Sequence, residues 1–180
     1  MKISFIAPSS YGKSTAVEII QSYFKSKNIK IAKPLYDLQE YFHHFIGHDI
    51  GDTQDGELLQ FLGIKIRKEN PKFLLDNFYQ NVTNTESEII TNDDCRPPDY
   101  DFLKQLGFIF IKINGFRRDR NDYVKANDKS SIEWQSEMPW DYELNNLGTL
   151  EDYEKNILNL LKEIMKDEKM LCNTIRKVLL

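Results

Sequence analysis

The 180-residue chain is poor in cysteine and has no long apolar segment. Its two cysteines, Cys95 and Cys172, are too few for the disulfide framework of a small secreted protein, which predicts free thiols and a reducing cytoplasm. No apolar run approaches the roughly 20 residues that a membrane-spanning helix needs, and the N-terminus lacks the apolar segment of a signal peptide. We therefore expect a cytoplasmic protein with no membrane partner.

The sequence also lacks an excess of positive charge: 24 Lys and Arg stand against 28 Asp and Glu, for a net charge of −4. Proteins that bind nucleic acid generally carry a basic surface, so this balance argues against a nucleic-acid partner. Internal repeats and low-complexity tracts are absent too. With 41% hydrophobic and 29% charged residues, the chain is most simply one globular domain over residues 1–180.

The most informative stretch is 7–15, with the sequence Ala-Pro-Ser-Ser-Tyr-Gly-Lys-Ser-Thr. It follows an apolar run at 3–7, typical of a buried strand, and precedes a helix predicted from Ser14 to about Lys27. A loop between strand and helix directs backbone N–H groups and the positive end of the helix dipole at one point, which suits a polyphosphate. The spacing fits GxxxxGK[ST], except that Ala7 replaces the first Gly.

In that motif the lysine, here Lys13, reaches the β- and γ-phosphates, and the next hydroxyl, on Ser14, ligates Mg²⁺. Ala7 is compatible with the motif if its φ is negative. The alternative is an ordinary turn in which Gly12 relieves the backbone and Lys13 is solvated. The residues expected to hold ATP are Ser10, Tyr11, Gly12, Lys13, Ser14 and Thr15.

Beyond this loop, apolar strand patterns alternate with helical patterns. Strands are predicted at 29–32, 88–92 and 108–113, and helices at 35–46, 57–69, 71–81, 99–106, about 149–166 and 171–180. Such alternation is typical of a parallel sheet covered on both faces. We predict an α/β, three-layer fold with a mostly parallel central sheet of about five strands.

The alternation stops at a long polar segment. Long irregular segments in compact domains are usually functional or disordered, and we predict a lid at about 116–146. Arg117, Arg118 and Arg120 open this segment, and an arginine carried by a closing segment can stabilise the charge of a phosphoryl group in transfer. The alternative for these arginines is a solvated charge run.

Two acidic residues, Asp93 and Asp94, follow the predicted strand 88–92. Ligands of open α/β sheets bind at the carboxyl ends of the strands, so Asp94 is predicted to face the Mg²⁺ on Ser14; the alternative is a turn-forming acidic pair. Arg96 is a candidate contact for an acceptor phosphate. Arg67 is another such candidate, although charged helix faces are common.

Other chemistries receive less support. His44 and His48 have the i,i+4 spacing of zinc ligands and His43 lies beside them, but no third ligand has a zinc-like spacing. No Ser-His-Asp or Cys-His arrangement is present. A phosphate acceptor is largely ionised at pH 7 and needs no base, whereas a hydroxyl acceptor would need one, such as Asp93 or Asp94.

Several segments together resemble the phage-type deoxynucleoside monophosphate kinases, a branch of the P-loop nucleotide kinases. Five family motifs have counterparts here in the same order: Phe-Ala-x-Pro-Leu at 31–35, Leu-Leu-Gln-x-x-Gly at 58–63 with Arg67, Asp-x-Arg-x-Pro at 94–98, Ser-Glu at 136–137 and Asn-x-Gly-Thr-Leu at 146–150. The chain departs from the family at Ala7, at Asp99-Tyr100 in place of Asn-Glu, and at Trp134 in place of a lid His.

The resemblance implies transfer of the ATP γ-phosphoryl, with Mg²⁺, to a (deoxy)nucleoside monophosphate. It makes Asp94 the metal-side carboxylate and Arg117 or Arg118 the closing arginine, with acceptor-binding helices at about 35–85 and a possible homodimer. The residues it assigns to the acceptor are Lys33, Arg67, Arg96 and Glu137. Two alternatives stay open: a P-loop kinase of another small molecule, similar to dephospho-coenzyme A kinase, and a nucleotide-binding switch protein. The sequence has no guanine-reading Asn-Lys-x-Asp.

Overall fold

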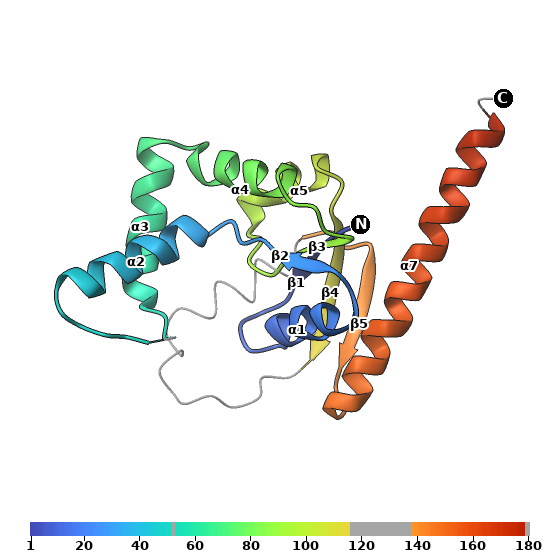
Figure 1. Cartoon of the computed structure of the whole chain (residues 1–180), viewed down its shortest axis with the longest axis horizontal. Coiled ribbons are helices and arrows are strands. Elements are labelled where there is room, and N and C mark those ends of the chain that lie inside the picture. Colours follow the sequence, from blue (N-terminus) through green and yellow to red (C-terminus); the bar gives the residue numbers. More distant parts are fainter. Residues whose placement is uncertain (52, 116–137, 179–180) are drawn as a thin grey trace.

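The computed structural model describes residues 1–51, 53–115 and 138–178, with side chains as far as residue 167. Its centre is a five-stranded parallel sheet with helices on both faces (Figure 1). The strands are β1 (Lys2–Ile6), β2 (Ser26–Asn28), β3 (Ile89–Asn92), β4 (Ile109–Gly115) and β5 (Tyr142–Asn146), in the order β2-β3-β1-β4-β5. The predicted α/β fold with about five parallel strands is confirmed.

The helices connect the strands and lie close to their predicted positions. They are α1 (Lys13–Tyr23), α2 (Lys33–Phe45), α3 (Gly56–Glu69), α4 (Phe73–Thr83), α5 (Tyr100–Gln105), which follows the 3-10 turn η1 (Pro97–Asp99), and α7 (Leu150–Val178). The two helices predicted at the end of the chain are one continuous helix, α7. No helix in the described ranges is long and apolar enough to cross a membrane.

Each face of the sheet carries its own hydrophobic core. On one face α1 and α7 pack over Phe5 and Ile111, and on the other α4, α5 and the start of α2 pack over Ile6 and Phe110. Neighbouring residues of β1 and β4 thus enter opposite cores, because successive side chains of a strand point to opposite faces. This double burial explains the near-continuous apolar runs of these strands.

The second strand lies three residues before the predicted strand at 29–32. Ile29 and Ile31 are buried, which accounts for the apolar pattern. The backbone N–H groups of Ile31 and Ala32 bond to the carboxylate of Asp94 rather than to a neighbouring strand. A side chain thus replaces the sheet ladder as the partner of this segment.

The predicted lid at about 116–146 extends too far toward the C-terminus. Its last part contains the buried Met138 and β5, which pairs with β4 at the edge of the sheet. Only Leu144 and Asn146 of the five β5 residues are buried, so the strand has a weak apolar pattern. Residues 116–137 lie outside the described part of the chain, and there the lid remains a prediction.

Candidate active site

The loop between β1 and α1 has the backbone expected of a phosphate-binding turn. Ser10 and Gly12 both have a positive φ, of 67° and 96°, and left-handed residues of this kind help backbone N–H groups to converge on an anion. Ala7, in place of the first Gly of the motif, does not have a positive φ, so its methyl group is tolerated. Ser14 and Thr15 form the first turn of α1, whose positive end faces the loop.

This loop is held in place by the C-terminal half of the chain. Asn146 Nδ2, at the end of β5, donates to the carbonyl of Tyr11 at 3.0 Å, and the hydroxyl of Tyr153 in α7 donates to the carbonyl of Gly12 at 3.1 Å. A Cβ atom on Gly12 would lie only 2.4 Å from Asn146 Nδ2, so a side chain does not fit. The Asn-x-Gly-Thr-Leu motif indicated Asn146, but no sequence signal indicated Tyr153.

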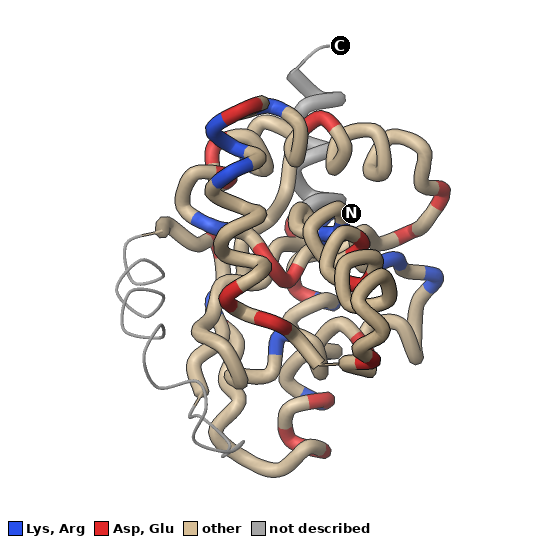
Figure 2. The backbone as a smooth tube through the Cα atoms, turned by 90° about the vertical axis from the view of Figure 1, so that its left-hand side faces the viewer, with Lys and Arg blue, Asp and Glu red and all other residues tan. Residues whose placement is uncertain are grey.

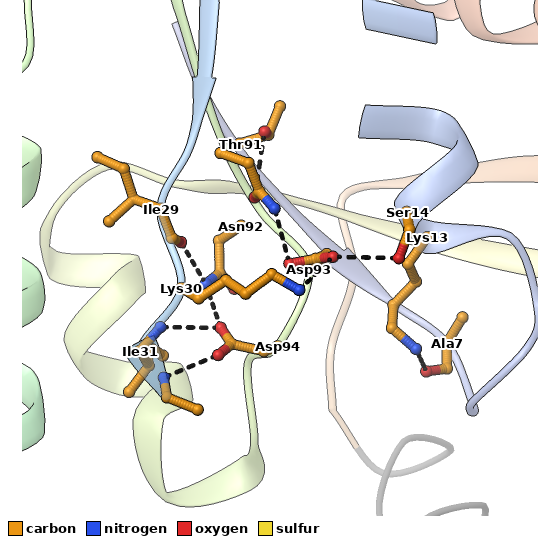
Figure 3. A network of polar contacts seen from close by, with 12 residues as sticks. Ala7, Lys13, Ser14, Ile29, Lys30, Ile31, Thr91, Asn92, Asp93 and Asp94 are labelled. Atoms are coloured by element: carbon orange, nitrogen blue, oxygen red, sulfur yellow. Dashed lines mark hydrogen bonds and ion pairs between the residues drawn. The ribbon is translucent and has the colours of Figure 1, made fainter. Parts of the chain in front are cut away.

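The side chain of Lys13 folds back along the loop, as Figure 3 shows. Its Nζ donates to the carbonyls of Ala7 at 2.6 Å and Pro8 at 2.8 Å. The ammonium group therefore lies within the loop and is partly buried, which argues against the alternative of an ordinary turn with a solvated lysine. Phosphate oxygens entering the loop would meet this charge at short range.

Asp93, rather than Asp94, faces the loop (Figure 3). Its Oδ2 lies 3.4 Å from the hydroxyl oxygen of Ser14 and 3.2 Å from Nζ of Lys30, and its Oδ1 accepts from Asn28 Nδ2 at 3.0 Å. The carboxylate is only 4% exposed. The first turn of α1 and the end of β2 thus bring polar groups to one carboxylate that follows β3.

Asp94 points the other way and fixes the chain between β2 and α2. Its carboxylate accepts from the N–H groups of Ile31 at 3.0 Å and Ala32 at 2.8 Å and from Asn92 Nδ2 at 2.6 Å. Burial raises the pKa of Asp94, and these hydrogen bonds only partly oppose the rise. Asp94, predicted to face a metal on Ser14, is thus turned away from Ser14, and Asp93 lies beside it instead, since successive residues along extended backbone project to opposite sides.

The oxygens that converge from Ser14 and Asp93 fit Mg²⁺, a hard cation that proteins bind through one or two oxygen ligands, with phosphates and waters completing the shell. Within the described residues, no group of three or more His, Cys, Asp or Glu side chains could hold a metal ion. A divalent ion at Ser14 and Asp93 would therefore depend on oxygens of a bound nucleotide.

Lys30 was not among the predicted site residues. Its side chain is 33% exposed, and its Nζ lies 5.7 Å from the centre of the Tyr36 ring as well as against Asp93. Partial burial lowers the pKa of Lys30, but the charge and hydrogen bond of Asp93, together with the charges of Tyr36 and Asp94, outweigh this effect and the net pKa is raised, which keeps the ammonium protonated. A lone lysine in the apolar run 29–32 was the available signal.

Lys33, predicted to bind the acceptor, does not join this group. It begins α2, is 61% exposed and forms an ion pair with Asp37 one turn later on the same helix. The Lys33 ammonium is thus paired with Asp37 at the surface rather than with Asp93. Lys30, three residues earlier and just before the motif at 31–35, contacts Asp93 instead.

Arg67 pairs with a buried acid, Asp99, which lies three residues after the exposed Arg96. Arg67 Nη2 lies 3.4 Å from both carboxylate oxygens of Asp99, whose side chain is 3% exposed. Burial raises the pKa of Asp99, while the charges of Arg67 and Arg96 lower it. Asp99, one of the departures from the family pattern, thus gives Arg67 a fixed partner.

The remaining predicted residues, Arg117, Arg118, Arg120 and Glu137, lie outside the described part of the chain. Figure 2 shows acidic and basic residues interspersed on the side of the molecule that α2 and α3 present.

His43 and His48 lie close together, and His43 links two helices. His43 is buried, its Nε2 lies 3.1 Å from Asp55 Oδ2, and its ring lies 5.4 Å from that of His48. Asp55 also caps α3 by accepting from the N–H of Leu58, so His43 ties α2 to the start of α3.

Burial raises the pKa of the Cys95 thiol to about 12, which makes Cys95 unsuitable as a thiolate nucleophile.

Several solved structures share the architecture of this chain. A shikimate kinase from Bacteroides thetaiotaomicron matches with a TM-score of 0.52 and 12% identity over 92% of this chain and 98% of that chain. TT1252 from Thermus thermophilus matches with a TM-score of 0.53 and 15% identity over 91% and 97%. The fold is that of the P-loop kinases.

Sequence comparisons add no closer relative. No protein-family model matches the chain, and no curated protein matches it significantly. At the identities found, the structural likeness shows the fold alone.

Proposed function

We propose that the protein transfers the γ-phosphoryl group of ATP to a (deoxy)nucleoside monophosphate, with Mg²⁺. The observation that carries this proposal is the 3.4 Å approach of Ser14 Oγ and Asp93 Oδ2, beside a turn that closes on Lys13. A hydroxyl at the start of a helix, a carboxylate on the neighbouring strand and a lysine in the turn are the groups that P-loop enzymes use for a metal-bound triphosphate.

The donor side follows from the loop. Backbone N–H groups of residues 10–15 and the ammonium of Lys13 bind the phosphates, with Ser14 and Asp93 as the protein ligands of the metal. When bound, Mg²⁺ supplies charge neutralisation for the transferred group. Asn146 and Tyr153 hold the loop in the binding conformation without touching the phosphates themselves.

The acceptor side is assigned to Arg67 and Arg96. Asp99 fixes the guanidinium of Arg67 and lies three residues after Arg96, and guanidinium groups bind phosphate in a bidentate manner. Arg117 or Arg118 and Glu137 complete the proposal as lid contacts.

The hydrogen bonds of the two candidate bases favour a phosphate acceptor over a hydroxyl acceptor. Asp94 accepts three hydrogen bonds, and Asp93 is paired with Lys30 and Asn28. The oxygens of both carboxylates are thus already occupied by N–H or ammonium donors, which leaves them poorly placed to accept a proton from a substrate hydroxyl. A phosphate monoester needs none, because its second pKa lies near 6 and it is largely ionised at pH 7.

The test is a coupled assay of ADP release with dTMP, dGMP, dCMP, dAMP and the corresponding ribonucleotides as acceptors. We expect at least one monophosphate to stimulate ADP release, and Lys13→Ala to abolish the stimulation while the protein keeps its melting temperature. Lys27→Ala, an exposed lysine of β2, is the matched control and should retain activity. Slow ATP hydrolysis that no monophosphate alters would instead indicate a nucleotide-binding switch protein.

Two further parts of the proposal concern the cell rather than the site. The protein is proposed to act in the cytoplasm, and a homodimer is the assembly to test for. Cell fractionation tests the first, and light scattering of the purified protein tests the second.

A further inference from the structure

One oxygen of Asp93 is shared between two groups. Oδ1 accepts from Asn28 Nδ2, whereas Oδ2 lies 3.2 Å from Lys30 Nζ and 3.4 Å from Ser14 Oγ. A cation ligated by Ser14 and by the nearest carboxylate oxygen would therefore use the same atom that Lys30 contacts.

The three groups lie in a line across the sheet. Ser14 follows β1, Asp93 follows β3 and Lys30 follows β2, and these strands are neighbours in the order β2-β3-β1. Lys30 is thus on the side of Asp93 away from the phosphate loop, and α2 begins only three residues after it (Figure 3). This is the side of the site assigned above to the acceptor.

The charges around Asp93 depend on one another. Its carboxylate is 4% exposed, so it needs a nearby positive charge, and Lys30 supplies it. A divalent ion on Oδ2 would both satisfy the carboxylate and repel the ammonium across a short distance. Lys30 is one-third exposed and has a flexible stem, so its ammonium can leave Asp93 while the backbone stays in place.

We propose that Lys30 and the divalent metal ion compete for Oδ2 of Asp93, and that the displaced Lys30 ammonium binds an oxyanion of the acceptor. The inference rests on the proposed function and deepens it, because Lys30 then links the two substrates. Binding of the metal-bound nucleotide increases the affinity of the acceptor site for phosphate, and by reciprocity an acceptor phosphate favours the metal on Asp93.

The test measures binding rather than turnover. Calorimetry gives the affinity of the protein for β,γ-methylene ATP with and without Mg²⁺. The affinity with Mg²⁺ divided by the affinity without it, here called the Mg²⁺ ratio, measures how much the metal strengthens nucleotide binding. In Lys30→Met the competitor is gone, so this ratio should rise about tenfold, the effect of one charge-assisted hydrogen bond. Lys27→Met, at an exposed lysine of the preceding strand β2, should leave the ratio unchanged.

A second measurement follows the displaced ammonium. Inorganic phosphate is the probe, titrated into protein saturated with Mg²⁺ and β,γ-methylene ATP. The wild type should bind phosphate more tightly in this complex than alone, and Lys30→Met should lose that gain. If Lys30 is only a structural partner of Asp93, Lys30→Met should keep the increase in phosphate affinity. That result would overturn the proposal.

Lys30→Arg keeps the test decisive if Lys30→Met does not fold. A guanidinium pairs with a carboxylate through two parallel hydrogen bonds, so arginine should hold Asp93 more firmly and lower the Mg²⁺ ratio by severalfold. An unchanged ratio in Lys30→Arg contradicts the competition. Absence of any nucleotide binding by the wild type would instead contradict the proposed function, so the two failures are distinguishable.

Discussion

The hydroxyl of Tyr153 donates a hydrogen bond to the carbonyl oxygen of Gly12, which lies 141 residues earlier in the chain. Asn146 makes the equivalent contact to Tyr11. The turn proposed to bind the phosphates is thus shaped by two side chains of the C-terminal half, neither of which is expected to contact nucleotide. Nucleotide affinity should respond to changes at both positions.

Replacing Tyr153 by Phe should weaken ATP binding by severalfold and lower the free energy of unfolding by about 1 kcal/mol, because one buried hydrogen bond to the loop is lost. Calorimetry and urea unfolding measure the two effects. Tyr142→Phe is the matched control, since its hydroxyl bonds to exposed Asp167 on the surface. Equal effects of the two substitutions on ATP affinity would contradict the role of Tyr153.

Gly12→Ala should abolish nucleotide binding. The φ of 96° costs a residue with a side chain on the order of 1–2 kcal/mol, and the new methyl group would lie 2.4 Å from Asn146 Nδ2. Gly56→Ala provides the comparison, because a Cβ atom there meets nothing within 4 Å. Fluorescence titration with a labelled ATP should show loss only in Gly12→Ala; wild-type affinity in that variant would show that the turn does not hold the phosphates.

Neutralising Asp93 and neutralising Asp94 should affect different properties of the protein. Asp94→Asn replaces an acceptor of the Ile31 and Ala32 N–H groups by a group that can accept only through one atom, which should cost about 1–3 kcal/mol of unfolding free energy. Asp93→Asn should instead remove the Mg²⁺ dependence of nucleotide binding. Urea unfolding and metal-dependent binding separate these outcomes, and a reversal of the two phenotypes would return the metal role to Asp94.

The acid stability of the protein should depend on Asp55. The N–H of Leu58 and then the imidazole of His43 hold the pKa of Asp55 below its usual value, despite some desolvation. A lowered pKa stabilises the fold above the unfolded-state value of about 3.9, and this stabilisation is lost as pH falls through the lower folded-state value.

Asp55→Asn keeps a helix cap but removes the titrating charge. Its unfolding free energy should therefore decline less steeply than that of the wild type as pH falls below about 4. Urea unfolding at a series of pH values from neutral to acidic checks this. Parallel profiles for the two proteins would show that Asp55 contributes no pH dependence.

The parts of the fold that depend on local pattern could be predicted from the sequence. The strand, turn and helix around Lys13 and the apolar strands β3 and β4 follow from neighbouring residues alone. β5 could not be predicted in the same way, because an edge strand with only Leu144 and Asn146 buried lacks the pattern of a core strand.

Site residues were harder to predict where a choice depended on the orientation of a side chain. Asp93 and Asp94 are equivalent in the sequence, and only the path of the backbone after β3 decides which one faces Ser14. Lys30 lies in an apolar run that was predicted to be a strand, so it was not predicted as a site residue. Lys33 was predicted instead because it lies inside a family motif. Tyr153 contacts Gly12 from the other end of the chain, and no local spacing of residues predicts such a contact.

The contact of α7 with the turn after β1 also bears on how the protein is made. A ribosome releases the turn first and Tyr153 more than a hundred residues later, so the growing chain carries the phosphate-binding motif long before it can be held in shape. The nascent N-terminal half should therefore be unable to capture ATP until the last strand and helix emerge. Nucleotide capture would thus serve as a sign that synthesis has passed β5.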